Sequence, residues 1–584
     1  MTSELLQDKL LEISDLEVTF HADTGKVQAV RGLCFDLYRG ETLGIVGESG
    51  SGKSVTGLSL MRLLPSTGVE VKGMIRFYYT SGEAIDLRQL SESEMRQYRG
   101  NELAMIFQEP MTSLNPVLRC GEQVAEAIRL HRKLDTRAAK SEVLSWFEKV
   151  KLPEPKRMYD AYPHQLSGGQ KQRVMIAMAL SCQPLVLLAD EPTTALDVSV
   201  QKSILDLLHD LQTELGIAII FISHDLGVIA EIADRVLVMQ QGQIVEEGRV
   251  VNVFQHAQHP YTQGLLACRP ALDYRLRRLP LIRDFLEQGA TNFKDKIEHL
   301  KISPSDSADR LKHLQTQAPI LKVESVKVWF PVRKNIWGQP KDYVKAVDGV
   351  SFEVHPGETL GLVGESGCGK TTLGRAILGL TAPTAGQVYF DGHNLSTCSD
   401  QEMQRLRRQM QIIFQDPYAS LNPRLTIGEA IIEPMRVHQI GHNEAERRGR
   451  AIDLLQTVGM GAVHLQRYPH EFSGGQRQRI CIARALALQP RFIICDEMVS
   501  ALDVSVQAQV LNLLLELREL YQLTYIFISH DLSVVKQMSD RMLVMNAGKI
   551  EAYGPADAIY ANPQSDYTRK LIAAIPKGQR VLKG

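Results

Sequence analysis

An internal duplication constrains this chain more than any other feature of its sequence. GIVGESGSGKS at 44–54 recurs as GLVGESGCGKT at 361–371, and YPHQLSGGQKQR at 162–173 recurs as YPHEFSGGQRQR at 468–479. The offset between the copies is 317 at the first motif (364 − 47) and 306 at the second (473 − 167). A chain of 584 residues is too long for one ordinary core. We therefore expect two copies of one domain in tandem.

The join between the copies is polar. Residues 291–318 contain Ser-Pro-Ser-Asp, a composition typical of an exposed connection. We expect a first domain at 1–270, a polar linker at 271–318 and a second domain at 319–584. Within each copy, apolar strands alternate with helical patterns, which indicates an α/β core with a largely parallel sheet.

Composition excludes several classes of protein. Apolar residues make up 44% and charged residues 23%, the ordinary balance of a folded chain. No stretch approaches the roughly 18 apolar residues of a membrane-spanning helix, and the N-terminus lacks a basic-then-apolar signal pattern. We expect a cytoplasmic chain with no direct membrane insertion. The net charge of −1 gives no general basic surface, so we expect no nucleic-acid partner.

Two Gly-rich loops predict phosphate binding. Each follows an apolar strand, fits G-x-x-x-x-G-K-[ST] and opens a helical pattern, the context that this motif requires. Glycines let backbone N–H groups turn toward phosphates, and a lysine reaches the β- and γ-phosphates of ATP. The predicted residues are Gly47, Glu48, Ser49, Gly50, Ser51, Gly52, Lys53 and Ser54 in the first copy, and Gly364, Glu365, Ser366, Gly367, Cys368, Gly369, Lys370 and Thr371 in the second.

Acidic pairs at the ends of two apolar strands predict the hydrolytic residues. LVLLADE and FIICDE place carboxylates where an α/β sheet binds its ligand. The first acid of each pair is predicted to bind Mg²⁺ with the loop hydroxyl, and the second to polarise water. We also expect a histidine at the γ-phosphate and a glutamine in the Mg²⁺ and water network. The catalytic candidates are Glu191, Glu497, His224 and His530, and the metal candidates are Ser54, Gln108, Asp190, Thr371, Gln415 and Asp496.

LSGGQ at 166–170 and FSGGQ at 472–476 resemble the signature motif of ATP-binding-cassette proteins. This resemblance implies, in each domain, a mainly parallel core sheet, an antiparallel β subdomain and a helical signature subdomain. It also implies a head-to-tail arrangement in which each ATP lies between one phosphate loop and the opposite signature motif. The site of Lys370 would then be completed by Ser167, Gly168, Gly169 and Gln170. The site of Lys53 would be completed by Ser473, Gly474, Gly475 and Gln476. The segments ALD at 195–197 and 501–503 match the D-loops of the family.

A narrower resemblance concerns the transport class. FQEPMTSLNP at 107–116, FQDPYASLNP at 414–423 and HPYTQGLL at 259–266 resemble the ATPases of peptide and nickel importers, and the chain is most similar to fused ATP-binding proteins of glutathione importers. The resemblance implies an ATPase coupled to uptake of glutathione or a short peptide. It also implies two transmembrane permease subunits, an extracytoplasmic substrate-binding protein, and a peripheral location at the cytoplasmic face of the inner membrane. DEMVS at 496–500 and SDYT at 565–568 depart from the family pattern.

Other functions stay open from the sequence alone. Tandem cassette ATPases that act on ribosomes also lack membrane spans, but they would favour a basic helical linker. A DNA-repair ATPase of this class would carry long coiled-coil or zinc insertions. Within the importers, dipeptides, oligopeptides and nickel are alternative substrates.

Overall fold

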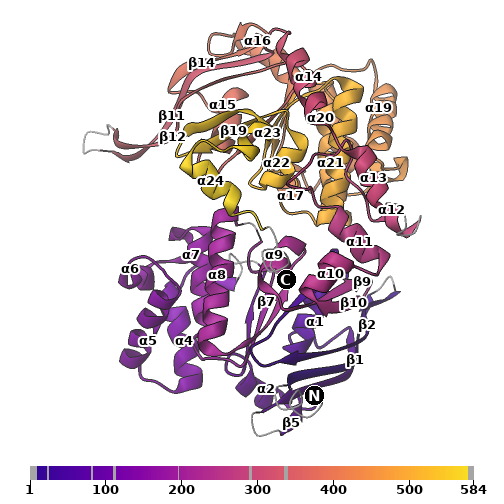
Figure 1. Ribbon diagram of the computed structural model, residues 1–584. Helices are drawn as coiled ribbons and strands as arrows, with labels where there is room; N and C mark the ends of the chain where they lie inside the picture. The colour runs from indigo at the N-terminus through magenta and orange to yellow at the C-terminus, as the bar shows by residue number, and fades with distance from the viewer. Residues whose placement is uncertain are drawn as a thin grey trace.

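The computed structural model describes residues 9–22, 25–79, 83–108, 113–194, 196–287, 293–334 and 340–576. Figure 1 shows two halves, with the first copy in indigo to magenta below and the second in orange to yellow above. The two predicted copies are therefore two separate sets of sheets and helices.

Each half is built on a six-stranded sheet. In the first half the order is β10-β9-β3-β8-β7-β6, and in the second it is β20-β19-β13-β18-β17-β16. Five strands of each sheet pair in parallel and the outermost strand pairs antiparallel. The strands are β3 (Thr42–Val46), β6 (Leu103–Ile106), β7 (Val186–Asp190), β8 (Ala218–Ile222), β9 (Arg235–Gln240), β10 (Gln243–Arg249), β13 (Thr359–Val363), β16 (Met410–Ile413), β17 (Phe492–Asp496), β18 (Thr524–Ile528), β19 (Arg541–Asn546) and β20 (Lys549–Pro555).

The central strands are buried on both faces, which explains their uninterrupted apolar sequences. All five residues of β7 and of β8 are buried, as are those of β17 and β18. Parallel strands covered on both faces by helices need apolar side chains at every position. The α/β prediction with a mainly parallel sheet is confirmed.

A second, four-stranded antiparallel sheet stands beside each core sheet. Its order is β2-β1-β4-β5 in the first half and β12-β11-β14-β15 in the second. Buried residues of this sheet, the core sheet and helix α1 form one apolar cluster in the first half. The predicted antiparallel subdomain is confirmed, with strands β1 (Lys9–Ala22), β2 (Gly25–Tyr38), β4 (Val69–Tyr78), β5 (Ala84–Asp86), β11 (Leu321–Lys334), β12 (Pro340–Val354), β14 (Ala385–Phe390) and β15 (His393–Asn394).

A helical subdomain precedes β7 and β17. In the first half it consists of α4 (Cys120–Arg132), α5 (Thr136–Lys149), α6 (Pro155–Asp160), the short 3-10 helix η1 (Pro163–Gln165) and α7 (Gly168–Leu180), and Trp146 and Phe147 are buried at its centre. The SGGQ motifs open the last helix of each subdomain, as the resemblance implies. The second half has α18 (Ile427–Val437), α19 (Glu444–Thr457), η3 (Ala462–Gln466), η4 (Pro469–Glu471) and α20 (Gly474–Leu486).

The remaining helices cover the sheets and carry the loops of the site. They are α1 (Lys53–Leu60), α2 (Glu92–Tyr98), α8 (Val198–Leu215), α9 (Leu226–Ile232), α10 (Val250–His256) and α11 (Pro260–Ala267) in the first half, and α15 (Lys370–Ile377), α16 (Asp400–Gln409), α17 (Pro417–Ser420), α21 (Val504–Tyr521), α22 (Leu532–Met538), α23 (Ala556–Ala561) and α24 (Asp566–Ala573) in the second. No helix among these described residues is long and apolar enough to cross a membrane.

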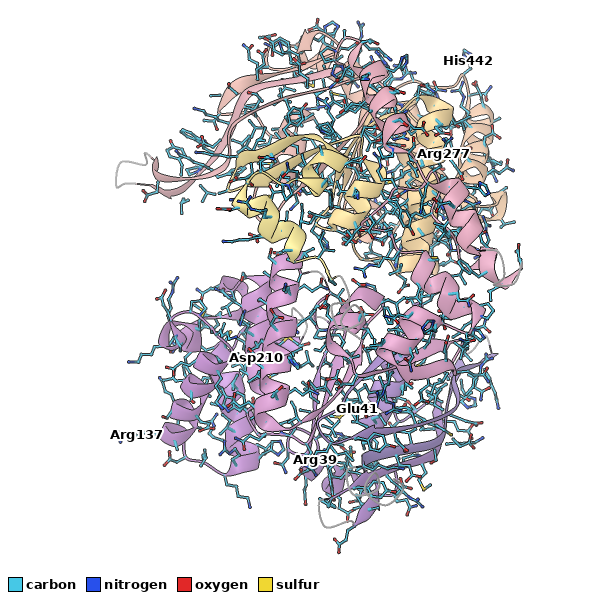
Figure 2. All side chains as sticks on the ribbon, viewed as in Figure 1. Arg39, Glu41, Arg137, Asp210, Arg277 and His442 are labelled. Carbon is cyan, nitrogen blue, oxygen red and sulfur yellow. The ribbon has the colours of Figure 1, made fainter. Side chains whose placement is uncertain are left out.

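The segment predicted as a polar linker packs against the second half. It contains α12 (Arg283–Leu286), α13 (Phe293–Leu300) and α14 (Pro304–Gln315). Leu276, Leu279 and Leu281 are 4%, 0% and 7% exposed and lie in the core cluster of the second half. The segment is also held to itself, because Arg277, which Figure 2 labels, donates to Asp306 at 3.2 Å. Its start is therefore a packed connector, although most described side chains from 298 to 318 are exposed or half-buried as predicted.

An ion pair, half-buried in the first half and buried in the second, is duplicated with the fold. Glu41, labelled in Figure 2, pairs with Arg235 at 2.7 Å, and Glu358 pairs with Arg541 at 2.6 Å. Both pairs join the start of the central strand to the neighbouring strand that follows α9 or α22. Each carboxylate also accepts a backbone N–H, from Tyr38 or His355. These contacts fix the same strand register in both halves, and that register sets the phosphate loops.

Candidate functional site

Each phosphate loop runs from the end of a central strand into a helix and can be built only with glycine at two points. Gly47 and Gly52 have φ of 154° and 99°. A Cβ at Gly47 would lie 2.2 Å from the Met239 carbonyl oxygen, and one at Gly52 would lie 2.5 Å from that of Ala29. The second loop repeats this arrangement, with Cβ approaches of 2.3 and 2.0 Å at Gly364 and Gly369. The loop conformation therefore requires the glycines of the motif.

The loop lysines are buried and bonded to their own loops. Lys53 is 6% exposed, and its Nζ donates to the carbonyls of Gly47 and Glu48 at 2.8 and 2.9 Å. Lys370 is 4% exposed and donates in the same way to Gly364 and Glu365. Burial lowers the pKa of Lys53, although nearby carboxylates oppose this effect.

The first loop fits a phosphate group. The Ser51 hydroxyl is buried and has no hydrogen-bond partner. The first turn of α1 adds N–H groups that lack intrahelical acceptors, together with the positive end of the helix dipole. An anion at this place would satisfy donors that the protein leaves unmatched. In the second loop Cys368 occupies the place of Ser51.

A hydroxyl and a carboxylate meet beside each loop. The Ser54 hydroxyl donates to Asp190 Oδ1 at 3.0 Å, and the Thr371 hydroxyl donates to Asp496 Oδ1 at 3.1 Å. Burial raises the pKa of Asp190 to about 6 and also raises the pKa of Asp496. Hard oxygen ligands of this kind suit Mg²⁺, so the residues present fit the predicted metal.

Glu191 lies at the centre of a polar cluster. Gln108 Nε2 donates to its carboxylate at 3.0 Å, the Thr194 hydroxyl donates at 2.9 Å, and His224 Nδ1 lies at 3.1 Å. Burial alone would raise the pKa of Glu191, but the contacts with His224 and Thr194 outweigh it and lower this pKa to about 2. The cluster therefore holds Glu191 as an ionised carboxylate.

The backbone of both candidate catalytic glutamates is strained. Glu191 and Glu497 have φ of 48° and 47°, in the left-handed region that L residues avoid. Each is held there by its own N–H, which donates to Ile222 or Ile528 at 3.0 Å. In this conformation the Glu497 carboxylate lies 3.6 Å from Lys370 Nζ of the loop.

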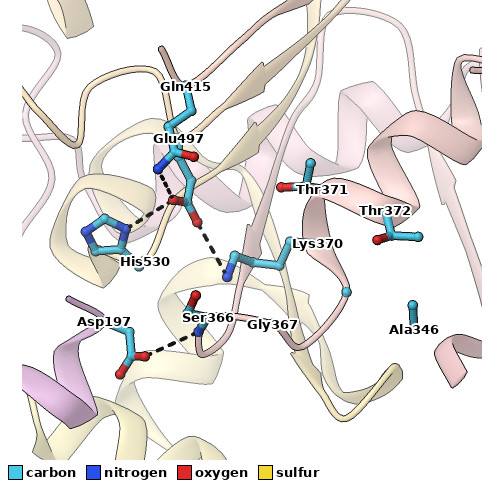
Figure 3. A pocket seen from close by; sticks show the side chains of 11 residues that line it. Asp197, Ala346, Ser366, Gly367, Lys370, Thr371, Thr372, Gln415, Glu497 and His530 are labelled. Carbon is cyan, nitrogen blue, oxygen red and sulfur yellow. Dashed lines mark hydrogen bonds and ion pairs between the residues drawn. The ribbon is translucent and has the colours of Figure 1, made fainter. Parts of the chain in front are cut away.

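The second site has the same glutamine, histidine and glutamate in a looser arrangement. Figure 3 shows Gln415, His530 and Lys370 directed at Glu497. Gln415 donates at 3.0 Å, His530 Nδ1 lies at 3.6 Å and Lys370 Nζ at 3.6 Å. These side chains and the loop line a cavity of about 240 Å³. The motifs predicted that these residues belong to one site, and in the structure they lie around one cavity.

The signature serines are not among the residues that line the described cavity at the Lys370 loop. The hydroxyls of Ser167 and Ser473 cap their own helices, accepting from Gln170 N and Gln476 N at 3.3 and 3.4 Å. Both serines are exposed, and neither lines the cavity around Lys370. The composite head-to-tail site thus stays a prediction.

The D-loop regions, in contrast, reach the opposite phosphate loops. Asp197 of the first half accepts from Ser366 N at 3.4 Å, as Figure 3 shows, and the Ser505 hydroxyl of the second half contacts the Glu48 carboxylate. Sequence reasoning matched the D-loops but assigned no site role to Asp197, Ser505 or Thr194. The ALD segment at 195–197 was the available signal for Asp197.

Comparison with known proteins follows the same division of the chain. Residues 30–194 and 347–500 match the family model described as ABC transporter. The chain belongs to the ABC transporter family. Like other ABC ATPases it hydrolyses ATP, with Mg²⁺ as the usual metal. Residues 245–292 match a second model, described as the C-terminal region of oligopeptide/dipeptide transporters.

Curated relatives of this ABC ATPase match along nearly its whole length. It is 51% identical to the glutathione import ATP-binding protein GsiA of Pectobacterium atrosepticum over 98% of this chain and 90% of that protein. It is 51% identical to GsiA of Escherichia coli K12 and 50% identical to GsiA of Salmonella typhimurium, over 98% of this chain and 91% of each relative. The resemblance predicted from the motifs is confirmed.

Proposed function

We propose that this ABC ATPase is the ATP-hydrolysing subunit of an importer for glutathione or a closely related short peptide. The observation that carries the proposal is the 51% identity to glutathione import ATP-binding proteins across both halves and the connector. The match of 245–292 to an oligopeptide/dipeptide transporter region supports the same substrate class. Nickel and longer peptides are the alternative cargoes.

The proposed partners are two transmembrane permeases and an extracytoplasmic substrate-binding protein, with the chain peripheral at the cytoplasmic face of the inner membrane. Exposed apolar side chains near the glutamine segments support a docking role. Phe107, Val117 and Leu118 are 41%, 76% and 42% exposed in the first half, and Tyr418 is 50% exposed in the second. Phe107 and Tyr418 are close in sequence to Gln108 and Gln415, so a permease bound here would be sensitive to the nucleotide site.

The proposed mechanism assigns one task to each residue type. Lys53 and Lys370 would bind the phosphates in place of their loop carbonyls. Mg²⁺, held by the loop hydroxyl and the strand-end aspartate, would supply positive charge to the phosphate oxygens. Glu191 and Glu497 would accept a proton from the attacking water, oriented by Gln108 and Gln415.

In the same proposal, His224 and His530 hold the glutamates and face the γ-phosphate. The signature residues of the opposite half would complete each site when the halves close. Ser-Gly-Gly at a helix start offers backbone donors and a positive dipole end, which suit an anion. The D-loop contacts of Asp197 and Ser505 support this pairing, because they already join each half to the other loop.

Uptake measured in cells that encode the chain would test the proposed cargo. Deletion should abolish uptake of radiolabelled glutathione, and the wild-type gene should restore it. The Glu191→Gln, Glu497→Gln double variant should not restore it, although it should accumulate and fractionate with the membrane like wild type. Uptake of a labelled dipeptide, an oligopeptide and nickel should be measured in the same strains.

Each alternative has its own outcome in this experiment. If the deletion strain took up glutathione normally but lost uptake of nickel or a dipeptide, the proposed cargo would be wrong and the importer function would stand. Unchanged uptake of every cargo, with salt-sensitive sedimentation of the chain on ribosomes, would overturn the importer proposal.

A further inference from the structure

One tyrosine from the C-terminal part of each half contacts the phosphate loop of that half. The Glu48 N–H donates to the Tyr261 hydroxyl at 3.1 Å, and the Glu365 N–H donates to the Tyr567 hydroxyl at 3.1 Å. The two tyrosines are 306 residues apart (567 − 261), the offset that also separates the SGGQ motifs. The contact therefore belongs to both copies of the duplication.

The sequence around the two tyrosines differs, yet the contact is the same. In HPYT, His259 Nδ1 caps α11 by accepting from Tyr261 N at 3.2 Å. In SDYT, the Ser565 hydroxyl caps α24 by accepting from Thr568 N at 3.0 Å. The departure in the second copy thus replaces one helix cap with another and keeps the tyrosine. The hydroxyl contact is the common feature.

The loop residue that each tyrosine contacts also holds the loop lysine. Glu48 donates its N–H to Tyr261, and its carbonyl accepts from Lys53 Nζ at 2.9 Å. In the second half, the Glu365 carbonyl accepts from Lys370 Nζ at 3.0 Å. Any displacement of this residue would move both the loop and the lysine that binds phosphate.

Both tyrosines stay neutral. Tyr261 is fully buried and Tyr567 is half-buried. Burial raises the pKa of Tyr567 to about 12 and raises the pKa of Tyr261 as well. A neutral hydroxyl can accept the loop N–H without placing a negative charge beside the phosphates.

The helices that carry the tyrosines lie where the halves meet. Figure 1 shows α11 and α24 in the region between the two halves. Arg269, just after α11, donates to the Pro576 carbonyl at 3.2 Å, and Lys202 of α8 donates to the Ala573 carbonyl at 3.4 Å. A rearrangement of the halves would therefore act on the same helices that hold the loops.

We infer that Tyr261 and Tyr567 are positioning residues that set the nucleotide affinity of their own halves by fixing the second residue of each phosphate loop. They do not touch the reacting atoms. The inference concerns nucleotide binding and holds for any cargo. It gives the C-terminal part of each half a role in the ATP site of that half.

The test uses the full-length purified chain and a fluorescent ATP analogue with Mg²⁺. In a Lys370→Ala background, binding reports on the Lys53 site. Tyr261→Phe keeps the ring and removes the acceptor of a partly buried N–H, so we expect affinity there to fall about tenfold. Tyr567→Phe should have this effect in the Lys53→Ala background and little effect in the Lys370→Ala background.

A matched control separates positioning from general loss of a tyrosine hydroxyl. Tyr159 is 2% exposed, and its hydroxyl donates to Glu122 at 2.7 Å, in the helical subdomain. Tyr159→Phe should leave nucleotide affinity unchanged. In the chain with both lysines intact, Tyr261→Phe should raise KM for ATP more than it lowers kcat. Unchanged affinity in Tyr261→Phe, or equal weakening of both sites by either tyrosine, would overturn the inference.

Discussion

At the residue scale, the two candidate catalytic glutamates are held differently. The Thr194 hydroxyl donates to the Glu191 carboxylate at 2.9 Å, whereas the corresponding Ser500 hydroxyl donates to the Glu497 backbone carbonyl at 2.8 Å. The histidine contact is 3.1 Å in the first site and 3.6 Å in the second. Burial opposes ionisation in both, but the histidine contact lowers the pKa of each glutamate. Both carboxylates are therefore ionised at neutral pH.

Replacing each glutamate with glutamine tests whether both sites hydrolyse ATP. Loss of a positioned base costs about 10²- to 10⁴-fold at its own site. We expect Glu191→Gln and Glu497→Gln each to impair the ATPase severely and the double variant to abolish it, while nucleotide binding survives. Glu214→Gln, a surface carboxylate paired with Lys149, is the control. Near wild-type turnover in Glu497→Gln would show that the second site is not a catalytic partner.

The spacing of the motifs predicted those site residues that lie at the end of a core strand or in the loop that follows it. Lys53, Asp190 and His224 each end or follow a central strand, so the sheet order alone brings them together. Asp197 and Ser366 are 169 positions apart, and only the packing of the two halves makes them neighbours. Neither motif nor periodicity contains that information.

At the scale of elements, the connector shows why composition alone does not reveal which part of a linker is packed. Residues 291–318 are polar, but the segment before them carries Leu276, Leu279 and Leu281, which enter the core of the second half. The backbone of Leu279 lies outside any strand or helix. Instead, Asn512 on α21 accepts from Leu279 N at 2.8 Å and donates to the Leu279 carbonyl at 2.8 Å. A lone asparagine within a helix gives no sequence signal of such a partner.

Removing this asparagine should loosen the connector. Asn512 is 4% exposed, and Asn512→Ala would leave the buried N–H and carbonyl of Leu279 without partners. Each such loss costs about 1–3 kcal/mol, so we expect the free energy of unfolding of the second half to fall by about 2–6 kcal/mol in denaturant titrations. Asp206 is the corresponding position of α8 (512 − 306) and is exposed. Asp206→Ala should therefore change stability little, and an equal effect of both would contradict a specific role for Asn512.

At the scale of the whole molecule, the duplication predicted the shared topology of the halves, but not how they meet. The described contacts join each phosphate loop to the opposite D-loop region. The signature serines remain exposed and cap their own helices. A two-site mechanism needs these serines to meet the opposite nucleotide, and paired substitutions can show which loop each signature motif serves.

Combining Ser473→Arg with each loop-lysine variant gives that answer. A bulky cation in place of the Ser473 donor should block hydrolysis of ATP held by Lys53, because losing a preorganised donor to developing charge costs roughly 10²- to 10³-fold in rate. Adding Lys53→Ala should then change the ATPase rate little further, since both substitutions impair the Lys53 site. Adding Lys370→Ala should remove nearly all activity, since both sites are lost. The loss of the helix cap costs about 1 kcal/mol and is common to both pairs, so the contrast between them is unaffected. Non-additivity with Lys370 instead would mean that each half completes its own site.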